Sequence, residues 1–207
     1  MTEYDHEPVR GLPGDLPAGE RIIWQASPDW RAFRRDALFT RWLAVYFGGL
    51  ALLSLAGGNL FGAAAIVVAG MILQGLLTLF AVLVARTTVY TLTNRRVVLR
   101  VGVALNKCIN LPLGLIGSAD LRKGANGHGD IALSLIGRHR LGYAMLWPHA
   151  RPFRVSRPQP MLRALTDAPK LAEALARACA AVVPNEAPVA ATTSGPAIEG
   201  ALQGVAA

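Results

Sequence analysis

A chain of 207 residues accommodates one compact domain with a further short element, and it is too short for two large domains. Hydrophobic residues reach 53% and charged residues only 16%, which is more apolar than a soluble domain of this size needs. The formal net charge is +8, so the chain combines an apolar excess with a basic surplus.

The first predicted elements precede the most apolar region. Residues 1–18 mix acidic residues with Pro and Gly, which predicts a flexible segment. They contain no basic start followed by an apolar run, so no cleavable signal peptide is expected. Residues Glu20–Trp24 have the apolar character of a strand. We therefore predict that residues 19–41 hold the first strand and a pre-membrane segment.

A long uncharged stretch follows. Residues 42 to 85, 44 in all, contain no Asp, Glu, Lys, Arg or His. One membrane helix needs only about 20 apolar residues, so this stretch predicts a transmembrane helical hairpin. The turn is expected at Ala56-Gly57-Gly58-Asn59, because Gly accepts positive φ and Asn competes for backbone hydrogen bonds. The predicted helices are Trp42–Ala56 and Phe61–Ala85.

Two alternatives to a full hairpin remain open. The first predicted helix is short for a bilayer crossing, so a re-entrant hairpin is one alternative. A buried hairpin in a soluble fold is the other, although few folds of this size cover so many apolar faces. Arginines flank both ends of the stretch while the turn carries no positive charge, so the positive-inside rule predicts a multi-pass protein with both termini in the cytoplasm.

Three residues of the second predicted helix are candidate helix contacts. Ala65 and Ala69, with Gly70 beside them, form a stripe of small residues that permits close helix packing. Gln74 is the one strongly polar side chain in this helix, and an unpaired amide is costly in lipid. We expect Gln74 to hydrogen-bond to another helix or to a second copy, and a homodimer is predicted.

The pattern changes after Arg86 to short runs of β-branched residues separated by polar residues and Gly, which indicates strands. The first strand is expected to complete the same sheet, so the hairpin would interrupt a single β domain. The predicted strands are Thr87–Thr93, Val97–Val101, Lys107–Leu111, Leu115–Leu121, Ile131–Ile136, Leu141–Trp147 and Phe153–Ser156.

One helix is predicted to end this domain, which covers residues 86–183. Asp167 suits the cap and Pro169 the first turn, and Leu171, Leu175 and Ala178 recur at helical spacing. Residues 184–207 are rich in Ala, Pro, Gly and Thr without periodicity, which predicts a disordered tail.

The region from Arg86 to Arg163 is strongly basic. It contains 13 Lys or Arg and two acidic residues, a local charge of +11. Anionic lipid headgroups and an acidic protein partner both fit such a surface, and a tether beside an anionic bilayer favours lipid. No recognition motif accompanies the charge, so nucleic acid is not expected. The predicted lipid or partner contacts are Arg95, Arg96, Lys107, Arg138 and Arg140.

The sequence gives little support to catalysis or metal binding. Its histidines are scattered, and no nucleophile elbow, HExxH, Walker loop or dinucleotide-binding motif occurs. Cys108 and Cys179 stand 71 positions apart without metal spacing, so we expect two buried apolar thiols. His128 and His149 suit the magnesium of a chlorin pigment chemically, but surface histidines are the favoured interpretation. We predict no catalytic residue, no cofactor and no metal.

Several segments resemble known families. Gly19-Glu20, the run Tyr90–Arg96 and Gly102 resemble the bacterial pleckstrin-homology-like membrane proteins. More narrowly, YDHEPVRGLPG at 4–14, GERIIWQASPDW at 19–30, INLPL at 109–113 and RPQPMLRALTDA at 157–168 are similar to the photosynthetic complex assembly proteins of purple bacteria.

The resemblance implies a fold and a function. The fold is a β-sandwich or open barrel of about seven strands closed by a C-terminal helix, here with the hairpin inserted. The implied function is a non-enzymatic accessory factor for assembling the reaction centre and core light-harvesting complex in the cytoplasmic or intracytoplasmic membrane, with their subunits as partners. A general anionic-lipid-binding membrane module and a bacteriochlorophyll carrier are the alternatives.

Overall fold

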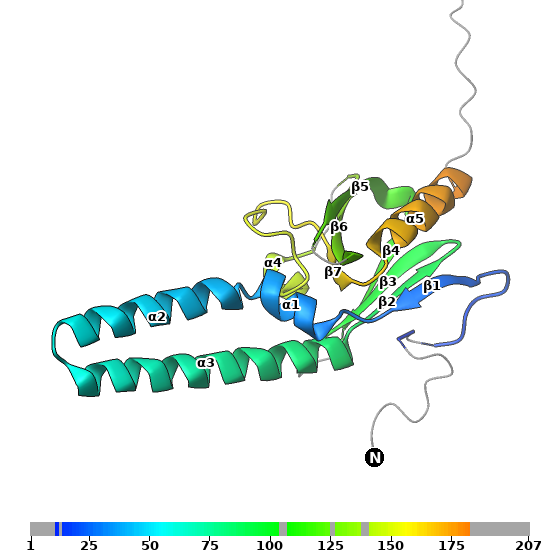
Figure 1. Cartoon of the computed structure of the whole chain (residues 1–207). Helices are drawn as coiled ribbons and strands as arrows, with labels where there is room; N and C mark the ends of the chain where they lie inside the picture. Colours follow the sequence, from blue (N-terminus) through cyan, green and yellow to red (C-terminus); the bar gives the residue numbers. More distant parts are fainter. Residues whose placement is uncertain (1–10, 13, 104–106, 125–126, 138–140, 183–207) are drawn as a thin grey trace, which may run out of the picture.

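The computed structural model describes residues 11–12, 14–103, 107–124, 127–137 and 141–182 (Figure 1). The predicted disordered tail, 184–207, and most of the predicted flexible segment lie outside these residues. Flexibility up to residue 18 stays a prediction, although the described part of this segment makes one close contact with the sheet domain. The Leu12 side chain is buried, and the Gly11 Cα lies so close to Val89 that a Cβ there would fall 2.6 Å from its Cγ1. This contact ties the N-terminal segment to the sheet domain.

Seven strands form two antiparallel sheets in the described part of the chain. The first sheet has the order β1-β2-β3-β4, and the second has the order β5-β6-β7. The strands are β1 (Ile22–Ala26), β2 (Val89–Thr93), β3 (Arg96–Val101), β4 (Lys107–Pro112), β5 (Ile116–Lys123), β6 (Gly129–Leu135) and β7 (Met161–Leu165).

Strand β1 lies before the hairpin in the sequence and pairs antiparallel with β2, which follows it. Trp24 pairs with Leu92 and Ala26 with Tyr90. The expectation that the first strand completes the same sheet is therefore confirmed. Because β1 and β2 are hydrogen-bonded neighbours, the chain enters and leaves the intervening hairpin from the same sheet domain.

The hairpin consists of α2 (Thr40–Ala56) and α3 (Leu60–Thr87), which lie side by side and project away from the sheets (Figure 1). The turn falls where the glycines predict it, and Asn59 caps α3 by accepting a 2.7 Å hydrogen bond from the Gly62 N–H. In the described part of the chain, α3 alone is long and apolar enough to span a membrane. Helix α2 qualifies only together with the preceding helix, from which it bends by 56°.

That preceding helix, α1 (Trp30–Ala37), was not expected within the pre-membrane segment. Asp29 caps it by accepting 2.8 Å hydrogen bonds from the backbone N–H groups of Arg31 and Ala32. Its few apolar residues stand among arginines, so the sequence shows no apolar face long enough to identify. Phe33 is fully buried and packs with Ala81 and Val84 of α3 in a small apolar cluster. Helix α1 therefore joins the hairpin to the sheet domain.

Two strand predictions are wrong and one strand was missed. Residues 141–147 contain the short helix α4 (Tyr143–Leu146), closed by a 3.2 Å hydrogen bond from the Leu146 N–H to the Gly142 carbonyl. Residues 153–156 form no strand. The seventh strand is β7, which is buried along its whole length although Arg163 stands at its centre.

The C-terminal helix α5 (Ala168–Val182) is present as predicted. Its Leu171, Leu175 and Ala178 side chains belong to the main core, which also takes residues from both sheets, from α4 and from the 3-10 turn η1 (Leu113–Leu115). Figure 1 shows α5 lying along the sheets at the end of the molecule away from the hairpin. Two antiparallel sheets closed by a helix confirm the α+β class and the C-terminal helix.

Candidate functional site

Helices α2 and α3 meet at polar contacts near their sheet-domain ends. Gln74 Nε2 donates a 2.7 Å hydrogen bond to the Thr40 carbonyl at the first residue of α2. Four residues further along α3, Thr78 Oγ1 accepts a 3.1 Å hydrogen bond from Arg34 Nη1 of α1. The predicted contact residue Gln74 therefore binds the other helix of its own chain, and its pairing with a second copy stays a prediction.

The close approach of the two helices uses other small residues than expected. Gly70 and Ala63 of α3 are buried, and a Cβ on Gly70 would lie 3.1 Å from the Phe47 side chain of α2. Ala65 and Ala69 are exposed on α3. They do not form the contact within the chain, and any role for them requires a second molecule.

The predicted basic contacts are dispersed along strand β3. Arg95 and Arg96 lie at the β2–β3 turn, while Lys107 pairs with Val101 at the opposite end. This separation is roughly 15 Å at the usual rise per strand residue. Arg138 and Arg140 lie outside the described residues. The β2–β3 turn is remote from the hairpin, so the headgroup contact stays a prediction whose geometry favours Lys107 over Arg95 and Arg96.

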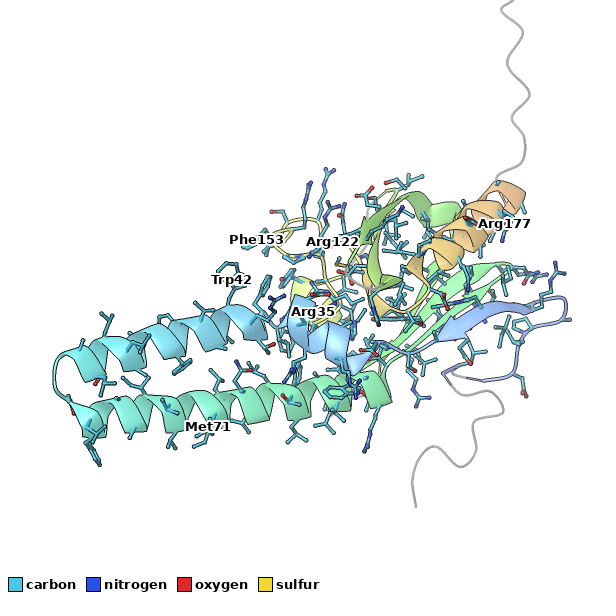
Figure 2. All side chains as sticks on the ribbon, in the orientation of Figure 1. Arg35, Trp42, Met71, Arg122, Phe153 and Arg177 are labelled. Atoms are coloured by element: carbon cyan, nitrogen blue, oxygen red, sulfur yellow. The ribbon has the colours of Figure 1, made fainter. Side chains whose placement is uncertain are left out.

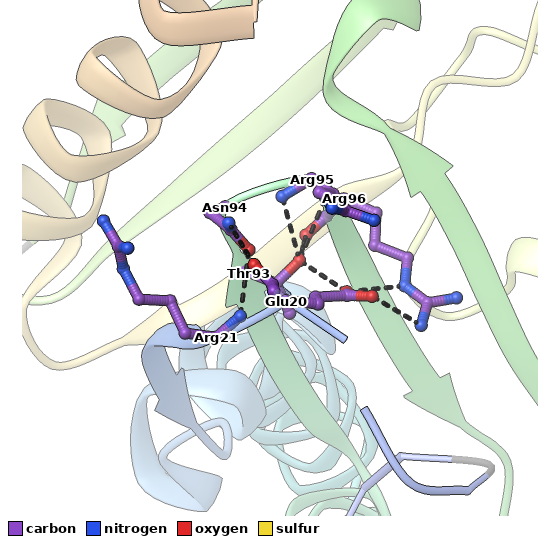
Figure 3. A network of polar contacts seen from close by, with 7 residues as sticks. Glu20, Arg21, Thr93, Asn94, Arg95 and Arg96 are labelled. Atoms are coloured by element: carbon purple, nitrogen blue, oxygen red, sulfur yellow. Dashed lines mark hydrogen bonds and ion pairs between the residues drawn. The ribbon is translucent and has the colours of Figure 1, made fainter. Parts of the chain in front are cut away.

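Arg96 takes part in a polar network that we call the distal clamp: Glu20, Thr93 and Arg96 (Figure 3). The Glu20 carboxylate accepts hydrogen bonds from Arg96 Nε at 2.8 Å and Arg96 Nη2 at 3.1 Å, and Thr93 Oγ1 lies 2.8 Å from Glu20 Oε1. Beside it, Asn94 contacts the backbone of Gly19 and Arg21. The clamp joins the chain before the hairpin to the chain after it.

The charge on Glu20 is stabilised inside the clamp. Its side chain is only 2% exposed, and this burial by itself raises the carboxyl pKa. Hydrogen bonds from Arg96 and Thr93 outweigh burial and hold the pKa of Glu20 below its ordinary value. The Gly19-Glu20 and Tyr90–Arg96 segments thus have a structural role, since they close the interrupted sheet.

A second network, the proximal cluster, lies where β2 leaves the hairpin and comprises Thr88, Tyr90, His149 and Arg163. Tyr90 Oη lies 2.7 Å from His149 Nδ1 and accepts a 3.2 Å hydrogen bond from the Arg163 N–H. Thr88 Oγ1 lies 3.3 Å from His149 Nε2. Both ring nitrogens are therefore engaged by the protein, and a neutral imidazole protonated on Nε2 satisfies all three contacts.

Burial sets the protonation states in the proximal cluster. It lowers the pKa of His149 to about 3, assisted by the positive charge of Arg163, and raises the pKa of Tyr90. Arg163 donates from Nη2 to the Ala150 carbonyl at 2.9 Å. His149 is thus a neutral core residue. The expectation of a surface histidine is wrong here, and a pigment ligand at His149 would require breaking these contacts.

The remaining candidate residues from the sequence, His128, Cys108 and Cys179, lie outside both polar networks. His128 is partly exposed, with Nε2 3.9 Å from Asp29 Oδ2. Cys179 is half-buried beside the main core, but Cys108 is exposed on β4, so the prediction of two buried thiols is wrong for Cys108. In the described ranges, His, Cys, Asp and Glu form no group of three able to hold a metal.

A basic groove of about 460 Å³, not predicted from the sequence, lies at the N-terminal end, or foot, of α2. Figure 2 shows its labelled members Arg35, Trp42 and Arg122 converging from α1, α2 and β5. Arg35 holds the Asp36 carboxylate by two hydrogen bonds of 2.9 and 3.1 Å. The groove is lined by Arg35, Asp36, Phe39, Arg41, Trp42, Val45 and Arg122.

Only part of the groove was detectable from the sequence. Arg35 and Arg41 precede the uncharged stretch and Trp42 begins it, a position where basic and aromatic residues meet a membrane surface. Arg122 comes from a strand 77 positions beyond Val45, and no periodicity connects the two. Its approach depends on how β5 packs beside α1, which is a tertiary property.

Two antiparallel sheets closed by a C-terminal helix define a small PH-like α+β domain, here interrupted by a helical hairpin after its first strand. The chain belongs to the bacterial PH domain family, whose model matches residues 41–178. It is also 37% identical over 212 residues to an uncharacterized 23.7 kDa protein in the puhA 5′ region of Rhodobacter capsulatus, covering 95% of this chain and 96% of that protein. No solved structure matches the chain significantly.

Proposed function

We propose that this chain is a membrane-anchored, non-enzymatic accessory factor that assists assembly of the photosynthetic reaction centre and its core light-harvesting complex. Exposed apolar side chains along the hairpin are the observation that carries the membrane anchor. Leu53, Phe61, Met71 and Ile72 are each more than half exposed. Exposing such area to water is unfavourable by about 25 cal/mol per Å², whereas a bilayer or neighbouring membrane helices would cover it.

The register of β1 and β2 supports a hairpin that enters and leaves the membrane on one face. Because these strands pair directly, the chain on both sides of the hairpin belongs to one domain. A single crossing would place β1 and β2 on opposite faces of the bilayer. The proposal therefore includes two spans, with the sheet domain and both termini in the cytoplasm.

In this proposal, the membrane surface lies near the polar contacts between the helices. Gln74 meets Thr40 there, and Arg34 meets Thr78 just outside it. From that level the hairpin reaches about 22–25 Å at 1.5 Å per helical residue, which is somewhat less than a hydrocarbon core of about 30 Å. Local thinning of the bilayer accommodates such a hairpin, and a re-entrant hairpin is the alternative arrangement.

The link to photosynthesis has separate support. The description of the Rhodobacter capsulatus relative places it beside puhA, a genomic context associated with photosynthesis. The match covers nearly the whole of both proteins, so hairpin and sheet domain are shared together. In this proposal, the hairpin packs beside newly inserted reaction-centre helices while the basic sheet domain meets acidic loops or anionic lipid at the surface.

Gene deletion in the photosynthetic host tests the assembly role. Membrane absorption spectra are expected to show reduced reaction-centre and core light-harvesting levels, restored by the wild-type gene. A matched variant replaces residues 43–73 with a short Gly/Ser linker, which the contact between Gln74 and Thr40 makes geometrically feasible. We expect this variant to fail in restoration. Unchanged spectra after deletion would contradict the assembly role and favour a general lipid-binding module.

Labelling of the hairpin turn tests the two-span topology. A Gly57→Cys substitution in a Cys108→Ser, Cys179→Ala background places one thiol in the exposed turn between α2 and α3, at a glycine whose φ of −78° other residues adopt. A membrane-impermeant maleimide is expected to label it from the outside of intact spheroplasts. Labelling only after lysis would instead indicate a re-entrant hairpin.

A further inference from the structure

We infer that the basic groove at the foot of α2 binds the headgroup of an anionic phospholipid, with an acyl chain lying along Trp42 and Val45. The inference rests on the proposed membrane anchor, since it takes the groove to be at the bilayer surface. It differs from the headgroup contacts predicted from the sequence, which lie elsewhere on the domain.

The charge of the groove fits a phosphate group. Arg35, Arg41 and Arg122 supply three positive charges, and Asp36 supplies one negative charge, which leaves a surplus of +2. Arg35 already occupies the Asp36 carboxylate at 2.9 Å. In the described part of the chain, neither Arg41 nor Arg122 forms an ion pair with an acidic side chain. Guanidinium groups bind phosphate oxygens through two parallel hydrogen bonds, so these two arginines are the principal ligands.

The other wall of the groove is apolar and identifies the ligand as a lipid. Trp42 is 74% exposed, Val45 66% and Phe39 55%. Trp42 and Val45 continue along α2 into the part of the hairpin proposed to lie in the membrane. A soluble phosphate compound would leave these side chains in water, whereas an acyl chain covers them. A Trp at this boundary also matches the preference of its amphipathic ring for the interface.

An adjoining polar recess extends the headgroup side of the groove. This recess, about 210 Å³ in volume, shares Asp36 and Arg122 with the groove, and its further lining residues are Lys123, Gly124, His128, Gly129, Asp130 and Ala164. The charge of Lys123 is balanced by that of Asp130, so the recess adds polar groups suited to a hydroxylated headgroup without adding net charge. A phospholipid therefore has its chain, phosphate and headgroup matched in order by an apolar wall, arginines and a polar recess.

Lipid retention by the full chain tests the inference. The protein is reconstituted into phosphatidylcholine nanodiscs containing a minor fraction of phosphatidylglycerol, and native mass spectrometry counts the lipids that remain bound. Wild type is expected to retain phosphatidylglycerol in preference to phosphatidylcholine. Arg41→Gln and Arg122→Gln are each expected to reduce this retention about tenfold, since each removes a charge-assisted contact to phosphate.

Arg177→Gln is the matched control. Arg177 lies exposed on α5, 4.0 Å from Glu173 and on the far side of the domain from the hairpin (Figure 2), so its loss should leave lipid retention unchanged. Equal retention in wild type and Arg122→Gln would overturn the inference. Release of the bound lipid by millimolar inorganic phosphate would overturn the lipid as the ligand in favour of a soluble phosphate.

Carbonate extraction separates this inference from the proposed function. If wild type is released from native membranes at alkaline pH, the membrane anchor itself fails. If the chain stays in the membrane but shows no preference for phosphatidylglycerol, only the groove assignment fails.

A second inference has an independent basis in the loop between Arg151 and Gln159. The base of this loop is fixed: Arg151 donates from Nη1 to Asp120 Oδ2 at 2.6 Å and to Gln159 Oε1 at 3.1 Å. Its tip presents Phe153, which is 98% exposed, and Val155, which is 67% exposed. Figures 1 and 2 show the loop directed toward the hairpin side of the domain, reaching the level at which α2 begins.

We propose that this tip inserts into the bilayer interface beside the hairpin, with Arg154 and Arg157 against anionic headgroups. Apolar residues flanked by arginines are suited to that boundary. An environment-sensitive fluorophore on Phe153→Cys, in the Cys108→Ser, Cys179→Ala background, should be quenched by spin-labelled lipid in vesicles. The same fluorophore on Arg177→Cys should not be quenched. Equal quenching at both positions, or none at Phe153→Cys, would overturn the proposal.

Discussion

The distal clamp and the proximal cluster stabilise the sheet domain by opposite means. The clamp joins the chain before the hairpin to the chain after it, whereas the proximal cluster joins β2 of the first sheet to β7 of the second. In the distal clamp, an ionised Glu20 is retained by Arg96, which is itself partly exposed. In the proximal cluster, His149 and Tyr90 are fully buried and neutral, and aromatic packing against Phe33 accompanies their hydrogen bonds. One junction depends on charge, while the other depends on the exclusion of water.

This difference follows from position. The β2–β3 turn lies at the surface, so Arg96, whose side chain is 26% exposed, keeps part of its hydration within the ion pair. The proximal cluster is enclosed by α1, α3 and β7, where a charge without a partner would be costly. The proximal cluster, which lies next to the hairpin, is therefore expected to be the more rigid of the two. A displacement of α3 would reach the sheets through it.

Among the substitutions that test this comparison, Phe33→Ala should have the largest effect on the stability of the chain. Phe33 is fully buried between the hairpin and β7, and its ring centroid lies 5.9 Å from that of His149. Phe33→Ala removes this packing and is expected to destabilise the chain by about 3–5 kcal/mol. Chemical unfolding of the detergent-solubilised chain, followed by circular dichroism, measures the change.

Phe153→Ala is the control for Phe33→Ala because the same side chain is removed from an exposed loop tip. Its stability in detergent should equal that of wild type within about 0.5 kcal/mol. If Phe33→Ala changed the stability as little as Phe153→Ala, packing of Phe33 against the proximal cluster would not contribute the stability expected of it.

The pH dependence of stability should then distinguish the two junctions. In the unfolded chain His149 takes up a proton near its ordinary pKa of 6.5, whereas burial lowers the folded pKa to about 3. Only the unfolded state gains a proton between these values, so stability falls as the pH drops below 6.5. The loss from this group at pH 5 is about 2 kcal/mol.

His149→Gln should remove that dependence while keeping a polar side chain in the cluster. The variant is expected to be less stable at pH 7 but to change less between pH 7 and pH 5 than wild type does. NMR of the folded wild type should show no titration of His149 in this range. A His149 resonance that titrates near pH 6.5 would show that the cluster is hydrated.

The sequence predicts the hairpin and most of the strands because their signals are local. The uncharged stretch, the Gly57-Gly58 turn and the strand pairs near Asn94 depend on residues close together in the chain. Helix α1 and strand β7 were missed for the opposite reason. Each carries arginines whose partners, Thr78 for Arg34 and the Ala150 carbonyl for Arg163, come from distant segments.

The candidate sites were harder to predict than the fold. Counting charges between Arg86 and Arg163 identified a basic region but could not show that Arg163 is buried or that Arg96 binds Glu20. The same count gave no weight to Arg35 and Arg41, which precede the hairpin in the sequence. Both lie beside Arg122 only in the folded chain, where α1, α2 and the end of β5 line one groove.

The smallest expected effect is at the distal clamp. Glu20→Gln removes the charge that Arg96 binds and is expected to cost about 1–2 kcal/mol at neutral pH. Because the folded pKa of Glu20 is lowered, its contribution is present above the ordinary value of 4.5 and is lost as the pH falls through the folded pKa. Wild type and Glu20→Gln should therefore converge in stability once the pH is below the folded pKa of Glu20, and the His149 dependence at higher pH should be common to both.

Glu173→Gln is the matched control for the clamp, because Glu173 pairs with Arg177 at 4.0 Å on the exposed face of α5. An exposed pair of this kind contributes about 0–1 kcal/mol, so the substitution should leave the unfolding curve nearly unchanged. If Glu20→Gln behaved like Glu173→Gln, the clamp would act only in setting the register of β1 against β2. Backbone hydrogen exchange in β1 would then be the measurement that still separates the two variants, since only the loss of Glu20 would accelerate exchange there.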